Sequence, residues 1–147
     1  MAPRTHPGNK QGVGRSIGAV VAGYVAMVVG VTLGLALLMW IAADEFPRDP
    51  GPYRGATWVL VVELGMAFAA AVGGGYVCGW VARRAERGHA LALAGLMLAL
   101  GAVSATAEAG LKPLWSSVGI VIVGVAGVVL GAAIRRRHRE RDTLRNR

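Results

Sequence analysis

The residue with the clearest chemical potential is Glu63, an ionisable group inside an otherwise apolar segment, 56–82. If that segment crosses a bilayer as a helix, Glu63 lies roughly 10 Å below its outer end. A charged carboxylate near the middle of a membrane helix costs at least ~2.5 kcal/mol, so such residues usually face protein or water and often carry function. Glu63 is therefore the candidate intramembrane functional residue.

Several hydroxyl side chains are expected at a similar depth, in the same half of the bilayer. They are Thr57, Ser104, Thr106, Ser116 and Ser117. These residues predict a shallow polar pocket that opens outward with Glu63 at its floor. In the alternative interpretation, Glu63 reaches toward the interface or pairs with Arg54 or Lys112, and the hydroxyls are ordinary helix-end residues.

The remaining reactive side chains do not form a recognisable catalytic or metal site. Asp44, Glu45 and Asp49 lack the rigid spacing of a calcium loop, and the histidines at 6, 89 and 138 are scattered. The single cysteine, Cys78, has no disulfide partner and is expected to be a small buried residue. No nucleophile–base pair can be assembled from the apolar segments. We expect no enzyme activity, no cofactor and no metal.

The elements that must position these residues are four apolar stretches, 17–43, 56–82, 89–107 and 114–134. Each is at or near the ~20 residues that a helix needs to cross a bilayer core. The sequence therefore predicts an all-α membrane protein, a bundle of four transmembrane helices. Residues 1–16 are expected to form a disordered cytoplasmic lead, and residues 135–147 a basic cytoplasmic tail that extends the last helix for a turn or two.

The basic residues fall on one side of this arrangement. The two ends of the chain and the middle loop hold 13 of the 16 lysines and arginines. This positive-inside bias places both termini in the cytoplasm of a bacterial inner membrane. The basic segments would lie near anionic headgroups, which bind at up to ~1 kcal/mol per basic residue. Topology therefore explains the sequence pI of about 11.1 without a nucleic-acid partner.

Small residues recur every four positions on three of the predicted helices, which permits close backbone approach. They are Gly18, Ala22, Ala26, Gly30 and Gly34 in the first, Ala67, Ala71, Gly75 and Gly79 in the second, and Gly127 and Gly131 in the fourth. The stripes indicate either a dimerisation face or packing within one bundle. We expect the first and second helices to form the tightest pair.

Two local motifs suggest a family. The segment from Gly74 to Arg83, with the pattern GGYxxGxxA, ends the second helix, and the segment from Lys112 to Trp115, with the pattern P-x-W, opens the fourth. This combination resembles a group of uncharacterised small four-helix bacterial inner-membrane proteins. The resemblance implies a membrane protein and brings no activity with it.

Two classes of function remain. The first is a structural or accessory protein that packs with itself or with a larger membrane partner, and the small-residue stripes favour it. The second is a small proton-linked transporter or carrier that uses Glu63.

Overall fold

A computed structural model describes residues 10–46, 52–53, 56–82 and 86–145. It contains α1 (Lys10–Ile41), a short 3-10 helix η1 (Ala43–Glu45), α2 (Thr57–Ala82), α3 (Glu86–Ala107) and α4 (Leu114–Arg145). Within these residues four helices are long and apolar enough to cross a membrane. The predicted fold class, an all-α bundle of four membrane helices, is confirmed. Residues 1–9 of the expected cytoplasmic lead lie outside the described residues.

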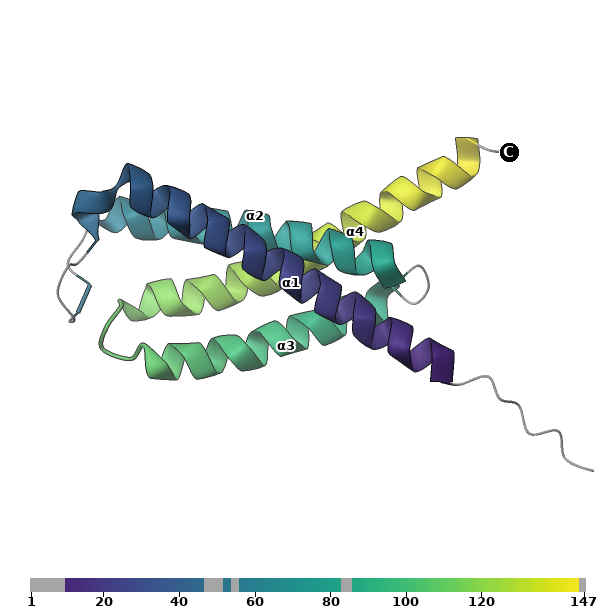
Figure 1. Ribbon diagram of the computed structural model, residues 1–147, viewed down its shortest axis with the longest axis horizontal. Helices are drawn as coiled ribbons and strands as arrows, with labels where there is room; N and C mark the ends of the chain where they lie inside the picture. Colours follow the sequence, from purple (N-terminus) through teal and green to yellow (C-terminus); the bar gives the residue numbers. More distant parts are fainter. Residues whose placement is uncertain (1–9, 47–51, 54–55, 83–85, 146–147) are drawn as a thin grey trace, which may run out of the picture.

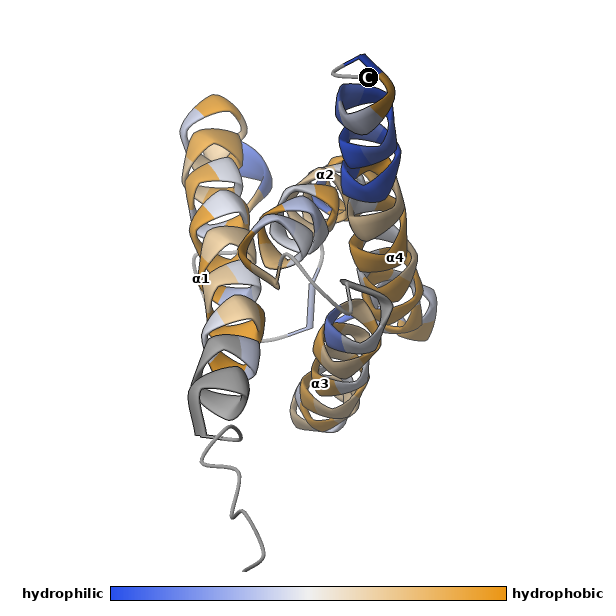
Figure 2. Ribbon diagram, turned by 90° about the vertical axis from the view of Figure 1, so that its right-hand side faces the viewer, coloured by the Kyte–Doolittle hydropathy of each residue, from blue (hydrophilic) through white to orange (hydrophobic). Residues whose placement is uncertain are grey.

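The helices are arranged around α2, which lies between α1 and α4 (Figures 1 and 2). Helix α3 packs mainly on α4, and α1 touches α3 only slightly. The spatial order is therefore α1, α2, α4, α3, and the side of the bundle between α1 and α3 is left open. The turn between α3 and α4 lies at the same end of the molecule as η1 (Figure 1).

Helices α2 and α4 make the closest backbone contact. A Cβ atom added at Gly75 would meet the carbonyl oxygen of Val128, and one added at Gly131 would meet the carbonyl oxygen of Val72. A Cβ at Gly127 would lie 2.8 Å from the Cβ of Ala71. The predicted small residues at 71, 75, 127 and 131 are therefore used for packing inside one chain. The expectation that the first two helices form the tightest pair is wrong, because the closest backbone approach is between α2 and α4.

The residues of α1 that contact α2 lie on a different face of the helix from the one that the four-residue spacing predicts. These residues are Ala19, Gly23, Met27, Gly30, Gly34 and Leu38. A Cβ at Gly23 would lie 2.7 Å from the Cβ of Cys78, and one at Gly34 would lie 2.6 Å from Met66 Cε. Gly18, in contrast, has no neighbour within 4 Å.

The reason for this difference is helical geometry. An α-helix has 3.6 residues per turn, so each step of four residues rotates about 40° beyond one full turn. Between Gly18 and Gly34 the drift adds up to about 160°. Only the outer half of the predicted stripe, Gly30 and Gly34, can face α2.

Helix α4 continues past its apolar part, which ends at Ile134, and remains helical to Arg145. The hydrophilic extension is visible at the C-terminal end of α4 (Figure 2). At its start the Arg135 guanidinium lies 5.8 Å from the centre of the Tyr76 ring, which also meets His138 edge-on. Such cation–π contacts are stabilising, so the extension is anchored to α2 where it leaves the bundle.

Candidate functional site: a charged cleft at the outer end of the bundle

The centre of the candidate site is an ion pair between two distant parts of the chain. Lys112 Nζ donates a hydrogen bond of 2.9 Å to Glu63 Oε1. The side chains of Lys112 and Glu63 are only 26% and 23% exposed. The pairing alternative for Glu63 is therefore the arrangement that the structure has, with Lys112 as the partner. Arg54, the other partner considered, lies outside the described residues.

The turn between α3 and α4 places Lys112 over the end of α2. Its residue Gly110 has a φ angle of +82°, a left-handed conformation that glycine adopts without steric cost. The backbone N–H groups of Leu111 and Lys112 both donate to the carbonyl oxygen of Glu108, at 2.9 and 3.4 Å. This tight turn brings the Lys112 ammonium back toward the bundle, where it meets Glu63.

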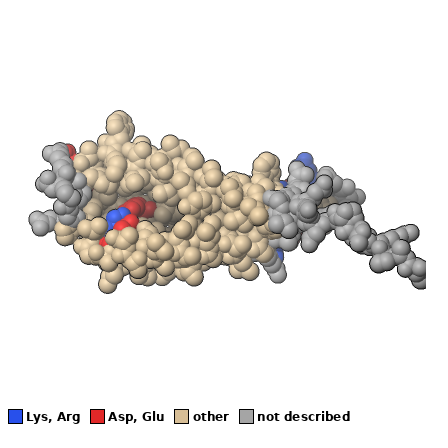
Figure 3. Space-filling view, turned by 60° about the horizontal axis from the view of Figure 1, so that its bottom comes forward, with Lys and Arg blue, Asp and Glu red and all other residues tan. Residues whose placement is uncertain are grey.

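A second carboxylate adjoins the pair. Glu108 Oε2 lies 4.0 Å from Lys112 Nζ, and its Oε1 accepts a hydrogen bond of 3.3 Å from Ser104 Oγ. Figure 3 shows acidic and basic side chains together in a hollow of a mainly uncharged face, with further charged side chains toward its ends. Among the described residues, two carboxylates thus share one ammonium, and the group carries a net charge of −1.

The backbone N–H groups of Tyr53 and Ala56 are hydrogen-bonded to neighbouring elements at this end of the bundle. The Tyr53 N–H donates a 2.6 Å hydrogen bond to the carbonyl oxygen of Leu111, and the Ala56 N–H donates one of 3.1 Å to Glu45 Oε2. Burial raises the pKa of the Tyr53 phenol, and the Glu45 and Glu63 carboxylates raise it further, while Lys112 lowers it. The main cause of the raised pKa of Tyr53 is therefore the burial of its phenol, and the two carboxylates are the smaller cause.

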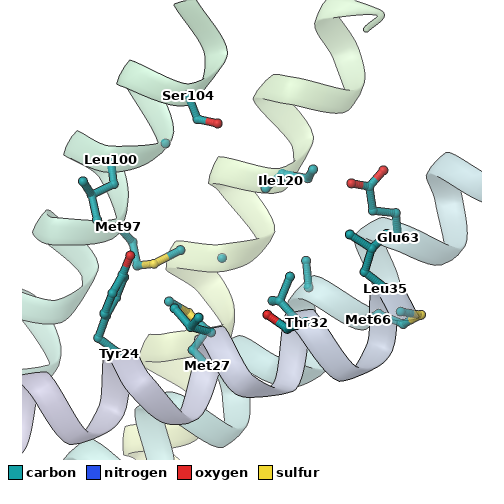
Figure 4. A pocket seen from close by; sticks show the side chains of 15 residues that line it. Tyr24, Met27, Thr32, Leu35, Glu63, Met66, Met97, Leu100, Ser104 and Ile120 are labelled. Carbon is teal, nitrogen blue, oxygen red and sulfur yellow. The ribbon is translucent and has the colours of Figure 1, made fainter. Parts of the chain in front are cut away.

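Below the ion pair, toward the middle of the bundle, lies a cavity of about 370 Å³. Its walls come from all four helices: α1 and α3 on its sides, α2 and α4 between them (Figure 4). The lining is mainly apolar and includes Met27, Met66, Met97 and Leu100, with Glu63 and Ser104 among its few polar groups. A smaller cavity of about 280 Å³ lies on the outer side of Glu63, beneath Tyr53 and Leu111.

The structure brings together only part of the predicted polar pocket. Ser104 lines the larger cavity with Glu63. Thr57 and Thr106 are exposed, and the Thr106 hydroxyl donates to the carbonyl oxygen of Val103 in its own helix. Ser116 and Ser117 are buried in the bundle and line neither cavity. The cleft is therefore an apolar space with a charged outer end.

The residues that sequence reasoning missed are the apolar side chains of the cavity, above all Tyr24 and the three methionines. Tyr24 marks the inner end of the cavity, and its hydroxyl points toward Met97 (Figure 4). In a helix that is apolar on every side, hydropathy does not separate a cavity wall from a lipid-facing surface. The sequence feature that could have indicated the cavity is the presence of the three methionines, because methionine side chains are flexible and adapt to apolar sites.

The described residues contain no group of three His, Cys, Asp or Glu side chains that could hold a metal ion. No family model, curated protein or solved structure matched the chain when it was compared with each. The resemblance to small four-helix inner-membrane proteins stays a prediction, and function has to be argued from the geometry of the bundle and its cleft.

Proposed function

We propose that the chain is a non-enzymatic accessory protein of the bacterial inner membrane, which packs with itself or with a larger membrane partner. The observation that carries the proposal is the unused half of the small-residue stripe on α1. Gly30 and Gly34 lie against Ala70 and Met66 of α2, whereas a Cβ added at Gly18 would meet no described atom within 4 Å. Ala22 and Ala26, further along the stripe, are partly exposed. Small residues on an exposed membrane face allow close approach of another helix.

The proposed orientation has both termini in the cytoplasm. It is supported by the basic segments, which hold 13 of the 16 lysines and arginines on one side of the four spans. The helical extension of α4 carries arginines at 135, 136, 137, 139, 141 and 145. On this orientation they lie at the inner surface, beside anionic headgroups.

The accessory role is tested by disulfide trapping in native membranes. With Cys78→Ala as the cysteine-free background, Ala22→Cys is compared with Gly73→Cys, which is exposed on α2 and has no neighbour within 4 Å. We expect oxidation to trap Ala22→Cys in a larger species and to leave Gly73→Cys monomeric. Adding Gly18→Leu to Ala22→Cys should abolish the product. Equal trapping at both positions would reflect random collision and would contradict the proposal.

A second candidate function, a small proton-linked carrier, is favoured by one observation: Glu63 lines a cavity that reaches toward the middle of the bundle. The ion pair with Lys112 opposes it, because the carboxylate that a carrier would use is already bound to an ammonium of the same chain. Carbodiimide labelling of Glu63 in native membranes separates the two, with Glu63→Gln as control. Labelling near neutral pH would support the carrier. Labelling only after denaturation at acid pH would support a structural ion pair.

A further inference from the structure

The larger cavity has the dimensions of a site for one apolar chain. Along α1 its lining runs from Tyr24 to Leu35, a helical rise of about 16 Å. This is roughly half of the ~30 Å hydrocarbon core of a bilayer. The volume of about 370 Å³ is within the range of small-molecule sites, which are mainly apolar with a few placed polar groups. A whole transmembrane helix, about 10 Å across, does not fit into such a volume.

The charge at the outer end of the cavity selects the kind of ligand. Glu63 and Glu108 share the single ammonium of Lys112, so one negative charge is uncompensated among the described residues. Glu63 is the member of this group that lines the cavity itself. A cationic group placed beside these carboxylates would be attracted, and an anionic group would be repelled.

We propose that the cleft between α1 and α3 binds an amphiphile that carries an ammonium group on a single apolar chain. The apolar chain lies along Met27, Met97 and Leu100, and the ammonium lies at Glu63 and Glu108. Flexible methionine side chains suit an apolar chain of variable shape. The site is separate from the α1 surface of the accessory role, and binding requires no transport.

The test uses the full chain in phosphatidylcholine nanodiscs and three amphiphiles with the same dodecyl chain. The ligands are radiolabelled dodecyltrimethylammonium, dodecyl sulfate and dodecyl maltoside, with empty nanodiscs measured in parallel to subtract partition into lipid. We expect specific binding of the ammonium compound at least about tenfold tighter than of the sulfate, because the uncompensated carboxylate attracts the trimethylammonium charge and repels the sulfate.

Two carboxylate variants test the charged end. Glu108→Gln leaves the Glu63–Lys112 pair intact and removes the uncompensated charge, so it should lower affinity for the ammonium compound by about tenfold. Adding Glu63→Gln leaves Lys112 as the only charge of the group, and the preference should then reverse toward dodecyl sulfate. Glu108 is at the more exposed end of the group, so its variant tests the proposal even if the double variant does not fold.

A matched pair of alanines tests the apolar part. Ala67 lines the cavity, whereas Ala69 is exposed on the same helix and does not line it. Ala67→Phe should fill the cavity and abolish specific binding of all three amphiphiles, and Ala69→Phe should leave it unchanged. Equal affinity of the native protein for the three headgroups, or equal binding by the two phenylalanine variants, would overturn the proposal.

The same chemistry can come from a free amine or from the headgroup of a single-chain aminophospholipid. Replacing part of the phosphatidylcholine by lysophosphatidylethanolamine, which has one acyl chain, separates these sources. Competition that disappears in Glu108→Gln would identify the bilayer lipid as occupant. Undiminished binding of dodecyltrimethylammonium would identify a free amphiphilic amine.

Discussion

Glu63 and Lys112 lie 49 positions apart and meet through a 2.9 Å ion pair between α2 and the turn that joins α3 to α4. Both side chains are about three-quarters removed from solvent. Either charge would be costly there alone, since a desolvated charge needs a partner. The pair therefore connects α2 to the turn between α3 and α4 and sets the charge at the mouth of the cleft.

Breaking this pair should destabilise the protein. We expect Lys112→Gln to lower the free energy of unfolding by about 2 kcal/mol, because Glu63 would keep its burial and lose its partner. Chemical denaturation in detergent micelles measures the effect. The double variant Glu63→Gln/Lys112→Gln should recover most of the loss, since both charges are then gone. Additive losses in the double variant would mean that the two residues act independently.

The glycines between α2 and α4 should be intolerant of even one methyl group. Gly131→Ala places a Cβ against the carbonyl oxygen of Val72, and Gly75→Ala places one against that of Val128. We expect each to cost about 2 kcal/mol or more, as overpacked positions typically do. Gly73→Ala is the control, because nothing lies within 4 Å of its added Cβ. Equal thermal stability of the three variants would contradict the α2–α4 contact.

Replacing Ser116 by alanine should stabilise the protein. Its side chain is fully buried, and its hydroxyl has no hydrogen-bond partner among the described residues. Removing an unsatisfied buried hydroxyl relieves a desolvation cost, so Ser116→Ala should raise the free energy of unfolding by about 1 kcal/mol. Ser104→Ala, which loses the hydrogen bond to Glu108, should not be stabilising. A less stable Ser116→Ala protein would show that the hydroxyl has a partner in the membrane.

Tyr53 should make stability fall at alkaline pH. Its pKa is raised in the folded protein above the ordinary value of 10.0, so as pH rises the unfolded chain releases this proton first. The stability linked to the protonated Tyr53 phenol is therefore fully present below pH 10 and is lost as the pH rises above it. Tyr53→Phe should be less stable near neutral pH, because it lacks the hydrogen bond to the Ala56 carbonyl oxygen. The difference in unfolding free energy between the native protein and Tyr53→Phe should narrow above pH 10. A difference that stays constant with pH would contradict the raised pKa of Tyr53.

The four helices could be predicted from hydropathy because apolar length is the dominant signal for a membrane span. The predicted boundaries at 56, 82, 107 and 114 agree with the helices to within a residue, whereas α1 begins at Lys10 and not at 17, and α3 begins at Glu86 and not at 89. The end of α4 could not be predicted in this way. Residues 135–145 are mainly polar, and they continue the helix that the apolar part of α4 has already formed, so no new nucleation is needed.

The site was predictable in part. Glu63 stands out because an ionisable residue in an apolar segment is rare, and Lys112 was one of its two expected partners. The choice of Lys112 depends on a glycine turn at residue 110 that only the fold reveals. The cavity depends on the separation of α1 from α3, which follows from α2 packing between α1 and α4. Stripes of small residues show which helices can approach closely and not which neighbour they will meet.

Because α4 is one uninterrupted helix, a tilt at its contact with α2 would produce a larger displacement at its C-terminal end. Its backbone is held against α2 at Gly127 and Gly131, and the helix runs from there to Arg145 without a break. From Gly127 to Arg145 the rise is about 27 Å. A tilt of about 10° at the glycine contact would displace Arg145 by about 5 Å. Small changes in the crossing of two membrane helices are thereby enlarged into a movement of the basic end of the chain.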